Sequence, residues 1–580
     1  MGFKQLLDTL RVSSKEAIVD GEKDSLSELK QYLHIDRTAE NDLSGLIRKI
    51  DAAGQSCLIL LMGNVGDGKS HLLAKMWERH KAILDTFQVH NDATESIRMD
   101  MTYIENLAQV LHPYSDEYLL TSDERPSCKT IIAINLGTLA NFLDERGTAF
   151  TQLRKFVDAH HLVDEQLELS TMPVETHFAA LNLTDYQIFE LEDRKAHPFV
   201  LAKILEKLTL RSSENPFYRA YEQTYQHHPN PSTCPVRYNF DLLSQKPIQQ
   251  LIGNLLIRAI LEDKLIISVR LVMNLLYDLI VPPELVTLSD EEIRQLVCGP
   301  ADAKTFYGAT MSVLLFESHN TSSILKSFAK HDPVSMSSAQ LDEQVIKLST
   351  ASQPEQQFIT SGVLSGDDAL YRHIPSLSID ERIQLFIRLS YISGKISMDT
   401  DGIFADYLGY LYDFNMGERK ALQPLYLLIE QALYQWNGST QPSSKMIVLD
   451  IGRRQSSFKV SRNLPVEAAP VAVERPEGKR LDRFSKTLKI GFSVSHGVGE
   501  ATKLDLDFQL YQAMVMVQRG YRPNKVDRNL FVKFSEFVNK LINHQSATKA
   551  LTIEEYSGQK KTKFTLSYTE GFQDFHFNAH

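Results

Sequence analysis

The sequence predicts an α/β fold built around a parallel sheet, and three observations support this prediction. The apolar run 57–62 is followed by the glycine-rich segment 63–70 and a helical stretch, an order typical of strand, turn and helix. The apolar, mostly β-branched run 129–135 is typical of a central parallel strand that is covered on both faces. Shorter strand-like runs at 86–90 and 175–183 are separated by helical stretches, as in a series of βαβ units.

The glycine-rich segment carries the most specific pattern in the chain. It reads Gly63, Asn64, Val65, Gly66, Asp67, Gly68, Lys69 and Ser70, which matches the P-loop pattern G-x-x-x-x-G-K-[ST]. Glycines let the backbone curl so that its N–H groups approach phosphate oxygens, and the positive end of the following helix favours the same anion. Lys69 would contact the β- and γ-phosphates of ATP, and the Ser70 hydroxyl would bind Mg²⁺. We therefore expect an α/β P-loop NTPase fold of the AAA+/STAND kind.

ATPases of this kind usually carry an aspartate or an Asp-Glu pair at the end of a strand next to the P-loop strand, and this acidic residue is harder to find here. No run of four apolar residues is followed by Asp-Glu, so two interpretations stay open. In the preferred one, Asp92 and Glu95 supply the acidic catalytic groups, Asp92 also binds Mg²⁺, and Asn135 senses the γ-phosphate. In the other, the strand that ends at Asn135 takes the place of the acidic strand, with asparagine as a substitute. A plainer explanation of Asn91 and Asp92 is a turn with Asx hydrogen bonds.

Changes in periodicity divide the chain into five regions. They are an N-terminal helical segment (1–50), the nucleotide-binding domain (51–195), a helical lid (196–290), a helical domain (291–440) and a basic α+β domain (445–580). Within the lid, Arg270 lies in the apolar, helical stretch 265–280, which makes it a candidate second sensor that contacts phosphate in the closed state. An interdomain salt bridge would explain this arginine equally well.

Charge is unevenly distributed along the 580 residues. The net charge is −11, yet residues 451–580 hold 21 Lys and Arg against 13 Asp and Glu. This asymmetry suggests a local contact with a polyanion such as DNA. The best candidate is a loop with four cations and an aromatic side chain, namely Arg519, Tyr521, Arg522, Lys525 and Arg528. A solvated loop without a partner is the alternative.

Other features argue against several classes of protein. The four cysteines are scattered without C-x-x-C spacing, so neither a zinc site nor a disulfide framework is expected from them. No apolar run approaches the roughly 20 residues that span a bilayer, and no signal peptide is recognisable, so we expect a cytoplasmic protein without a membrane segment. A nuclease-like pattern, Asp450 with Glu477 and Lys479, lies in a stretch with Pro and Gly, so nuclease activity is not expected.

A resemblance to a known family is carried by five stretches: 63–73, 91–96, 132–137, 281–283 and 520–524. Together they resemble the DptF family of DNA phosphorothioation-dependent restriction proteins, over most of the chain. The resemblance implies an NTPase subunit of a bacterial defence system that restricts DNA lacking a sulfur-for-oxygen replacement in its backbone. It also implies DptG-like and DptH-like companion proteins, and DNA contacted directly or through them. A homo-oligomer is compatible with these expectations.

Two classes of function therefore remain open. The first is an ATPase whose turnover drives closing of the lid and is passed to a basic domain on DNA. The second is a non-hydrolysing, nucleotide-controlled switch or scaffold that assembles partner proteins, which the missing Asp-Glu pair favours. A nucleotide-handling kinase is a third class, but the length of the chain and its large C-terminal half argue against it.

Overall fold

The computed structural model describes most of the chain, in two compact units. The described residues are 2–11, 28–91, 102–120, 128–163, 173–226, 231–297, 303–318, 320–335, 339–397, 401–439, 442–449, 458–495, 500–544, 550–557, 560–569 and 573–580. The first unit comprises Met1–Glu190, Ala196–Met398 and Asp482–Phe484, and the second comprises Leu191–Lys195, Asp399–Leu481 and Ser485–His580. None of the helices in the described ranges has the length and apolar content needed to span a bilayer.

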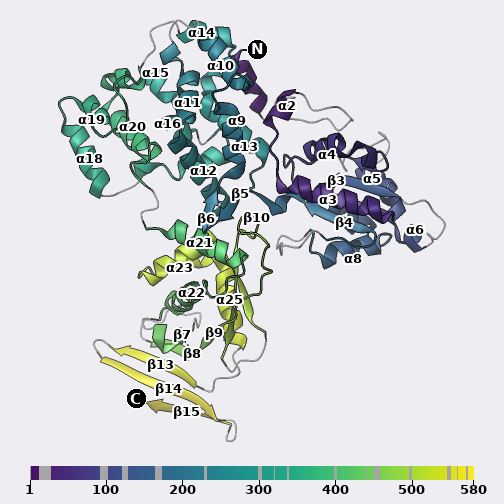
Figure 1. Ribbon diagram of the computed structural model, residues 1–580. Helices are drawn as coiled ribbons and strands as arrows, with labels where there is room; N and C mark the ends of the chain where they lie inside the picture. The colour runs from purple at the N-terminus through teal and green to yellow at the C-terminus, as the bar shows by residue number, and fades with distance from the viewer. Residues whose placement is uncertain are drawn as a thin grey trace. The chain divides into compact units, whose positions relative to one another are not determined.

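A four-stranded parallel sheet forms the core of the N-terminal part of the first unit (Figure 1). Its strands are β1 (Cys57–Met62), β2 (Gln88–His90), β3 (Lys129–Ile134) and β4 (Phe178–Asn182). The strand order is β2-β3-β1-β4, and all neighbouring strands run parallel. Met62 at the end of β1 is in register with Ile134 and Asn182. The predicted α/β character and parallel sheet are therefore confirmed.

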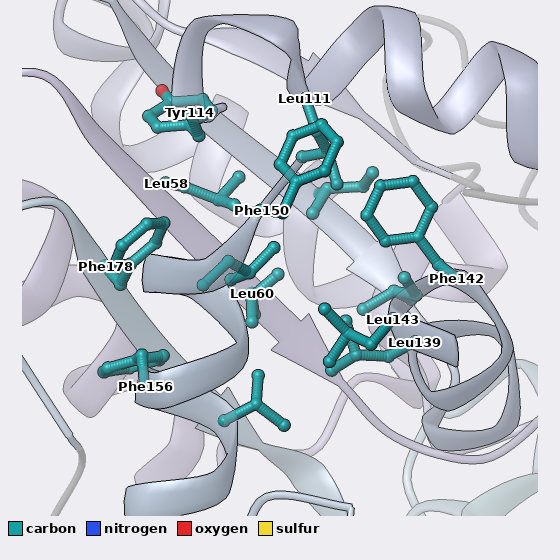
Figure 2. Packing of buried hydrophobic residues seen from close by; sticks show 14 of the residues in the cluster. Leu58, Leu60, Leu111, Tyr114, Leu139, Phe142, Leu143, Phe150, Phe156 and Phe178 are labelled. Atoms are coloured by element: carbon teal, nitrogen blue, oxygen red, sulfur yellow. The ribbon is translucent and has the colours of Figure 1, made fainter. Parts of the chain in front are cut away.

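Helices cover both faces of this sheet. The sheet therefore separates two hydrophobic clusters, one on each face. Helices α5, α7 and α8 pack on one face, and α3 and α4 pack on the other. Their bounds are α3 Thr38–Ala53, α4 Lys69–Leu84, α5 Tyr103–Leu111, α7 Leu136–Arg146 and α8 Thr151–Ala159. Figure 2 shows the first cluster. In it, the ring centroids of Phe142 and Phe150 lie 5.1 Å apart. Alternate residues of each strand serve the two clusters because successive side chains point to opposite faces.

The remainder of the first unit is mostly helical. The further helices are α1 Phe3–Leu7, α2 Glu28–Leu33, α6 Asp116–Leu120, α9 Phe199–Thr209, α10 Pro216–Tyr225, α11 Pro235–Leu243, α12 Lys246–Leu261, α13 Val269–Ile280, α14 Asp290–Val297, α15 Ala303–Gly308, α16 Met311–Glu317, α17 Ser323–Ala329, α18 Ala339–Thr350, α19 Pro354–Thr360 and α20 Ile379–Ile392. Three short strands were not predicted: β5 (Tyr186–Glu192), β6 (Lys195–His197) and β10 (Leu481–Arg483).

A buried arginine joins helix α20 to two neighbouring segments of this helical part. Arg388 is only 3% exposed, and its guanidinium lies 2.6 Å from Glu317 Oε1 and 2.6 Å from Asp332 Oδ2. Removing one partner of a buried ion pair leaves the remaining charges uncompensated. We therefore expect Arg388→Met to destabilise the first unit by about 3 kcal/mol, measured as a lower melting temperature in differential scanning calorimetry.

The matched control is Arg294→Met on helix α14. Arg294 pairs with Glu291 at 3.8 Å, and both side chains are exposed. Exposed pairs contribute little, so this variant is expected to change stability by less than about 0.5 kcal/mol. Equal melting temperatures for the two variants would contradict a stabilising role for the Arg388 cluster.

The second unit combines helices with two antiparallel sheets. Its helices are α21 Ile403–Asn415, α22 Gln423–Trp436, α23 Phe508–Gln518, α24 Lys525–Leu530 and α25 Val532–His544. Its strands are β7 Met446–Val448, β8 Phe458–Asn463, β9 Val466–Ala468, β11 Leu488–Val494, β12 Thr502–Leu506, β13 Ala550–Ser557, β14 Lys560–Thr569 and β15 Asp574–Ala579. The sheet orders are β12-β11-β9 and β15-β14-β13-β8-β7. The arrows of β13, β14 and β15 lie side by side in Figure 1. This unit also takes in α21 and α22 from the 291–440 region, and the finer five-part division stays a prediction.

Candidate functional site

The glycine-rich segment connects the end of β1 to the start of α4. Gly66 and Gly68 have φ angles of +89° and +92°, in the left-handed region that favours glycine. A Cβ atom at Gly66 would lie 2.8 Å from the Oγ of Ser268, so close packing also requires glycine there. Helix α4 begins at Lys69, and its first N–H groups, which lack partners inside the helix, point out of the end where the segment joins it.

Two charged side chains of the segment fold back onto its own backbone. Lys69 Nζ donates hydrogen bonds to the carbonyl oxygens of Gly63 at 2.8 Å and Asn64 at 2.9 Å. Asp67 Oδ2 accepts a hydrogen bond from the backbone N–H of Asn64 at 2.6 Å. The ammonium group is thus held against the loop by neutral acceptors, and an anionic ligand would be a stronger partner for it. The next residue, Ser70, is partly exposed in the first turn of α4.

Helix α13 brings a second segment against this loop. Ser268, which contacts Gly66, caps the helix by accepting a hydrogen bond from the N–H of Leu271 at 3.4 Å. Arg270 lies in the first turn, and its Cβ is 3.7 Å from the position that a Cβ at Gly66 would take. The structure therefore brings the predicted sensor residue next to the glycine-rich segment. Its role as a sensor stays a prediction.

Helix α13 starts four residues later than the apolar periodicity of the sequence predicts. The apolar stretch was interpreted as helical from Leu265, but Lys264 has a φ of +56° and the helix begins only at Val269. A serine directly before an apolar run is a helix N-cap signal, and Ser268 provides it here. The signal for the start of α13 was therefore present in the sequence, whereas the contact of Ser268 with Gly66 was not.

Arg37 also contacts the loop, and the sequence analysis missed it. It lies directly before α3, and its Nη2 donates to the backbone oxygen of Asp67 at 2.9 Å. Burial lowers the pKa of Arg37, and the nearby carboxylates of Asp67 and Glu40 oppose that shift. The guanidinium stays charged because arginine is not deprotonated in proteins. No local pattern marks Arg37, since the contact joins segments 30 residues apart.

Three asparagines follow or end the strands at the edge of the sheet that carries the loop. Asn91 follows β2, Asn135 follows β3 and Asn182 is the last residue of β4. The carboxyl ends of parallel strands meet at one edge, where ligands bind in open α/β sheets. Asn135 Oδ1 accepts a hydrogen bond from Thr138 N at 2.7 Å and so caps α7, which leaves its amide N–H₂ as the group able to contact a phosphate.

Asn182 was not singled out by the sequence analysis. It is 5% exposed, and its Oδ1 accepts a hydrogen bond from the N–H of Thr184 at 3.1 Å. Its position beside Met62, the residue before the loop, follows from the pairing of β4 with β1. A single sequence cannot reveal this pairing, because strand order is set by contacts between distant segments.

The predicted acidic groups cannot be placed in the same way. Asp92 and Glu95 lie outside the described residues, as does Asp450 of the nuclease-like pattern. Strand β3 lies between β1 and β2, so Asn91, which follows β2, lies two strands away from the strand that leads into the loop, and the neighbouring strand β3 ends before Asn135. Glu477 and Lys479 lie in a segment without a strand, as the sequence analysis expected.

The candidate DNA-contact residues lie together in the second unit, at the end of α23 and in α24. All five are exposed. Arg519 forms an ion pair with Asp401 at 2.7 Å, and the Tyr521 hydroxyl donates to Asp527 Oδ2 at 2.7 Å, which raises the pKa of Tyr521. Asn524 and Asp527 form a capping box at the start of α24. The loop is therefore ordered by its own contacts, and DNA binding by these residues stays a prediction.

Comparison with known proteins adds no relative to this description. No protein-family model matches the chain, and no curated protein matches it. Inference about function consequently depends on the residues and their geometry.

Proposed function

We propose that the chain binds ATP with Mg²⁺ at the glycine-rich segment and hydrolyses it. The observation that carries this proposal is the geometry between β1 and α4. A turn in which Gly66 has a positive φ, and in which a Cβ at that position would lie 2.8 Å from Ser268 Oγ, leads into a helix N-terminus, and Lys69 is held against the turn by two carbonyl oxygens. Backbone N–H groups and a cation converge there, which is the chemistry that phosphates require.

The residues present fit Mg²⁺-ATP. Lys69 would exchange its carbonyl partners for the β- and γ-phosphates, and the hydroxyl of Ser70, in the first turn of α4, would hold the metal together with Asp92. Bound Mg²⁺ supplies charge neutralisation for the phosphates. Arg37 donates a hydrogen bond to the loop, and the Cβ of Arg270 lies near Gly66, so two further basic residues belong to segments beside the loop.

Hydrolysis is supported by the strand order of the sheet. An additional strand, β3, separates the loop strand from β2, and Asp92 follows β2 by two residues. That order suits the interpretation in which Asp92 or Glu95 polarises the attacking water and Asn135 on the intervening strand orients the γ-phosphate. Asparagine cannot act as a general base, but its amide can donate a hydrogen bond.

A second candidate function is the non-hydrolysing switch or scaffold. Its support is that the described residues at the carboxyl ends of β2, β3 and β4 are Asn91, Asn135 and Asn182, with no carboxylate among them. In that case ATP would order the loop and the first turn of α13 without turnover, and partner proteins would recognise the ordered form.

The wider setting of the proposal is a bacterial phosphorothioation-dependent DNA restriction complex. In this setting the chain would act with DptG-like and DptH-like companions, and residues Arg519 to Arg528 would contact DNA. This part rests on the resemblance of the quoted motifs and on the basic charge of residues 451–580.

Nucleotide binding is tested most directly at Gly66. Gly66→Ala adds a Cβ at a φ of +89°, 2.8 Å from Ser268 Oγ, so the loop must distort. We expect ATP affinity, measured by titration with a fluorescent ATP analogue, to fall at least tenfold, or about 1.4 kcal/mol. The matched control is Gly45→Ala in the middle of α3, where a Cβ would meet nothing within 4 Å. Equal affinities of the wild type and both variants would contradict the proposed site.

A further inference from the structure

A group of metal-ligating side chains lies beside the loop and has no part in the proposed function. His34 and Asp36 belong to the segment before α3, and Glu40 lies in the first turn of α3. Their ligand atoms all lie within 4.8 Å of one another. His34 Nε2 is 2.8 Å from Glu40 Oε1 and 3.3 Å from Asp36 Oδ1. One imidazole nitrogen and two carboxylate oxygens thus converge from a segment of seven residues.

We propose that His34, Asp36 and Glu40 bind a divalent transition-metal ion such as Zn²⁺. Imidazole nitrogen and carboxylate oxygen together are ligands that Zn²⁺ takes in proteins, whereas Mg²⁺ takes oxygen ligands only. Three protein ligands leave one tetrahedral position for water. The side chain of Asp36 is 91% exposed and Glu40 is 6% exposed, so the ion can enter from the Asp36 side.

A second histidine orients His34 for this role. His71 Nε2 lies 2.7 Å from His34 Nδ1, and the two rings stack with their centroids 5.0 Å apart. The other nitrogen of His34 therefore faces the two carboxylates. Metal-binding histidines are oriented in this way, by a hydrogen bond on the nitrogen that does not bind the metal. Glu40 is held similarly, because its Oε2 lies 3.4 Å from Arg79 Nη2 while Oε1 lies near His34.

An ion-free hydrogen bond is the alternative explanation of the 2.8 Å contact between His34 Nε2 and Glu40 Oε1. His34 Nε2 can carry only one proton, yet two carboxylate oxygens approach it. That proton can satisfy one carboxylate fully, whereas a metal ion at the centre would satisfy the nitrogen and both oxygens. Arg79 lies near the far oxygen of Glu40, and the guanidinium of Arg37 lies near the same carboxylate.

The site also has a consequence for the loop. Arg37 lies between the ligands Asp36 and Glu40 and donates to the backbone oxygen of Asp67 at 2.9 Å. An ion that binds residues on both sides of Arg37 restrains the arginine and, through it, the glycine-rich segment. The metal site itself does not depend on nucleotide binding, so Lys69→Ala is expected to bind Zn²⁺ like the wild type.

The test is metal binding by the full-length chain without nucleotide. Isothermal titration with Zn²⁺ should show one tight site, and Co²⁺ substituted into it should give the visible absorption of a nitrogen- and oxygen-ligated ion. Asp36→Asn, at an exposed position, and Glu40→Gln should each weaken Zn²⁺ binding at least about tenfold, and His71→Ala by about 10- to 100-fold. Melting curves check that each variant is folded.

Glu78→Gln on α4 removes a carboxylate that pairs with Lys75 at 2.8 Å, outside the cluster, and should leave Zn²⁺ affinity unchanged. The chain has 18 histidines, so weak binding elsewhere is expected and only the tight site counts. A wild type without a tight Zn²⁺ site, or folded Asp36→Asn and Glu40→Gln variants that keep it, would overturn the proposal.

Discussion

Lys69→Ala is expected to reduce ATP turnover by two to three orders of magnitude, the usual loss when a charge-stabilising donor is removed from a transition state. In the structure the ammonium group lies against the loop, 2.8 Å from Gly63 O and 2.9 Å from Asn64 O, where the β- and γ-phosphates would approach. No other side chain of the segment carries a positive charge. Release of inorganic phosphate by the purified chain, with and without DNA, measures the effect. In the proposed restriction complex, restriction should be lost in parallel.

The matched control for this variant is Lys81→Ala. Lys81 is exposed near the other end of the same helix α4, far from the loop along the chain. The Lys81→Ala variant removes one positive charge, as Lys69→Ala does, and should leave ATP turnover unchanged. Lys69→Arg is a further comparison, because arginine keeps the charge but presents it in a different shape. Normal turnover in folded Lys69→Ala would contradict the proposed site, whereas tight ATP binding without turnover in the wild type would support the switch.

Asp92→Asn and Glu95→Gln are expected to have an effect on turnover as large as that of Lys69→Ala. A positioned general base contributes about 10²- to 10⁴-fold to a rate, so one of the two variants should lose turnover by that factor. Both replacements keep the size of the side chain and remove its charge. ATP affinity should change much less than turnover for Glu95→Gln, while loss of affinity for Mg²⁺-ATP in Asp92→Asn would assign Asp92 to the metal.

Asp85→Asn is the control for these acids. Asp85 is an exposed carboxylate directly after α4, between the loop helix and β2, and its charge should not matter for turnover. If Asp92→Asn and Glu95→Gln both hydrolyse ATP at the wild-type rate, the acid lies elsewhere in the chain. In that event the interpretation in which the Asn135 strand replaces the acidic strand becomes testable through Asn135→Ala, whose helix cap is lost together with its amide.

The proposed nucleotide site and the proposed metal site can be tested independently of each other. Lys69→Ala and Gly66→Ala test the nucleotide loop, and Asp36→Asn and Glu40→Gln test the segment before α3. Loss of Zn²⁺ binding with normal ATP turnover would show two independent sites. A change of ATP affinity on addition of Zn²⁺ would show that the contact of Arg37 with Asp67 couples them.

The elements whose signals are local could be predicted from the amino-acid sequence. The apolar run of β1, the turn with Gly66 and Gly68, and the helix from Lys69 are neighbours in the chain, so their pattern identifies them without knowledge of the rest. The buried strand β3 and its position before Asn135 were predicted for the same reason. The predicted start of α13 at Leu265 was wrong, because apolar residues with helical spacing precede the helix. The N-cap Ser268 marks the true start at Val269.

The contacts between these elements could not be predicted in the same way, because they form only in the folded chain. The order β2-β3-β1-β4 places Asn182 beside Met62, and packing of the α13 N-terminus places Ser268 and Arg270 against Gly66. Arg37 reaches Asp67, and His34 reaches His71, through similar long-range contacts. These contacts depend on burial of apolar faces by segments far apart in the chain, and such pairing leaves no periodic trace in one sequence. The glycine-rich loop could therefore be predicted from its own residues. The charged residues around it, and the convergence of the candidate metal ligands, were found only in the folded chain.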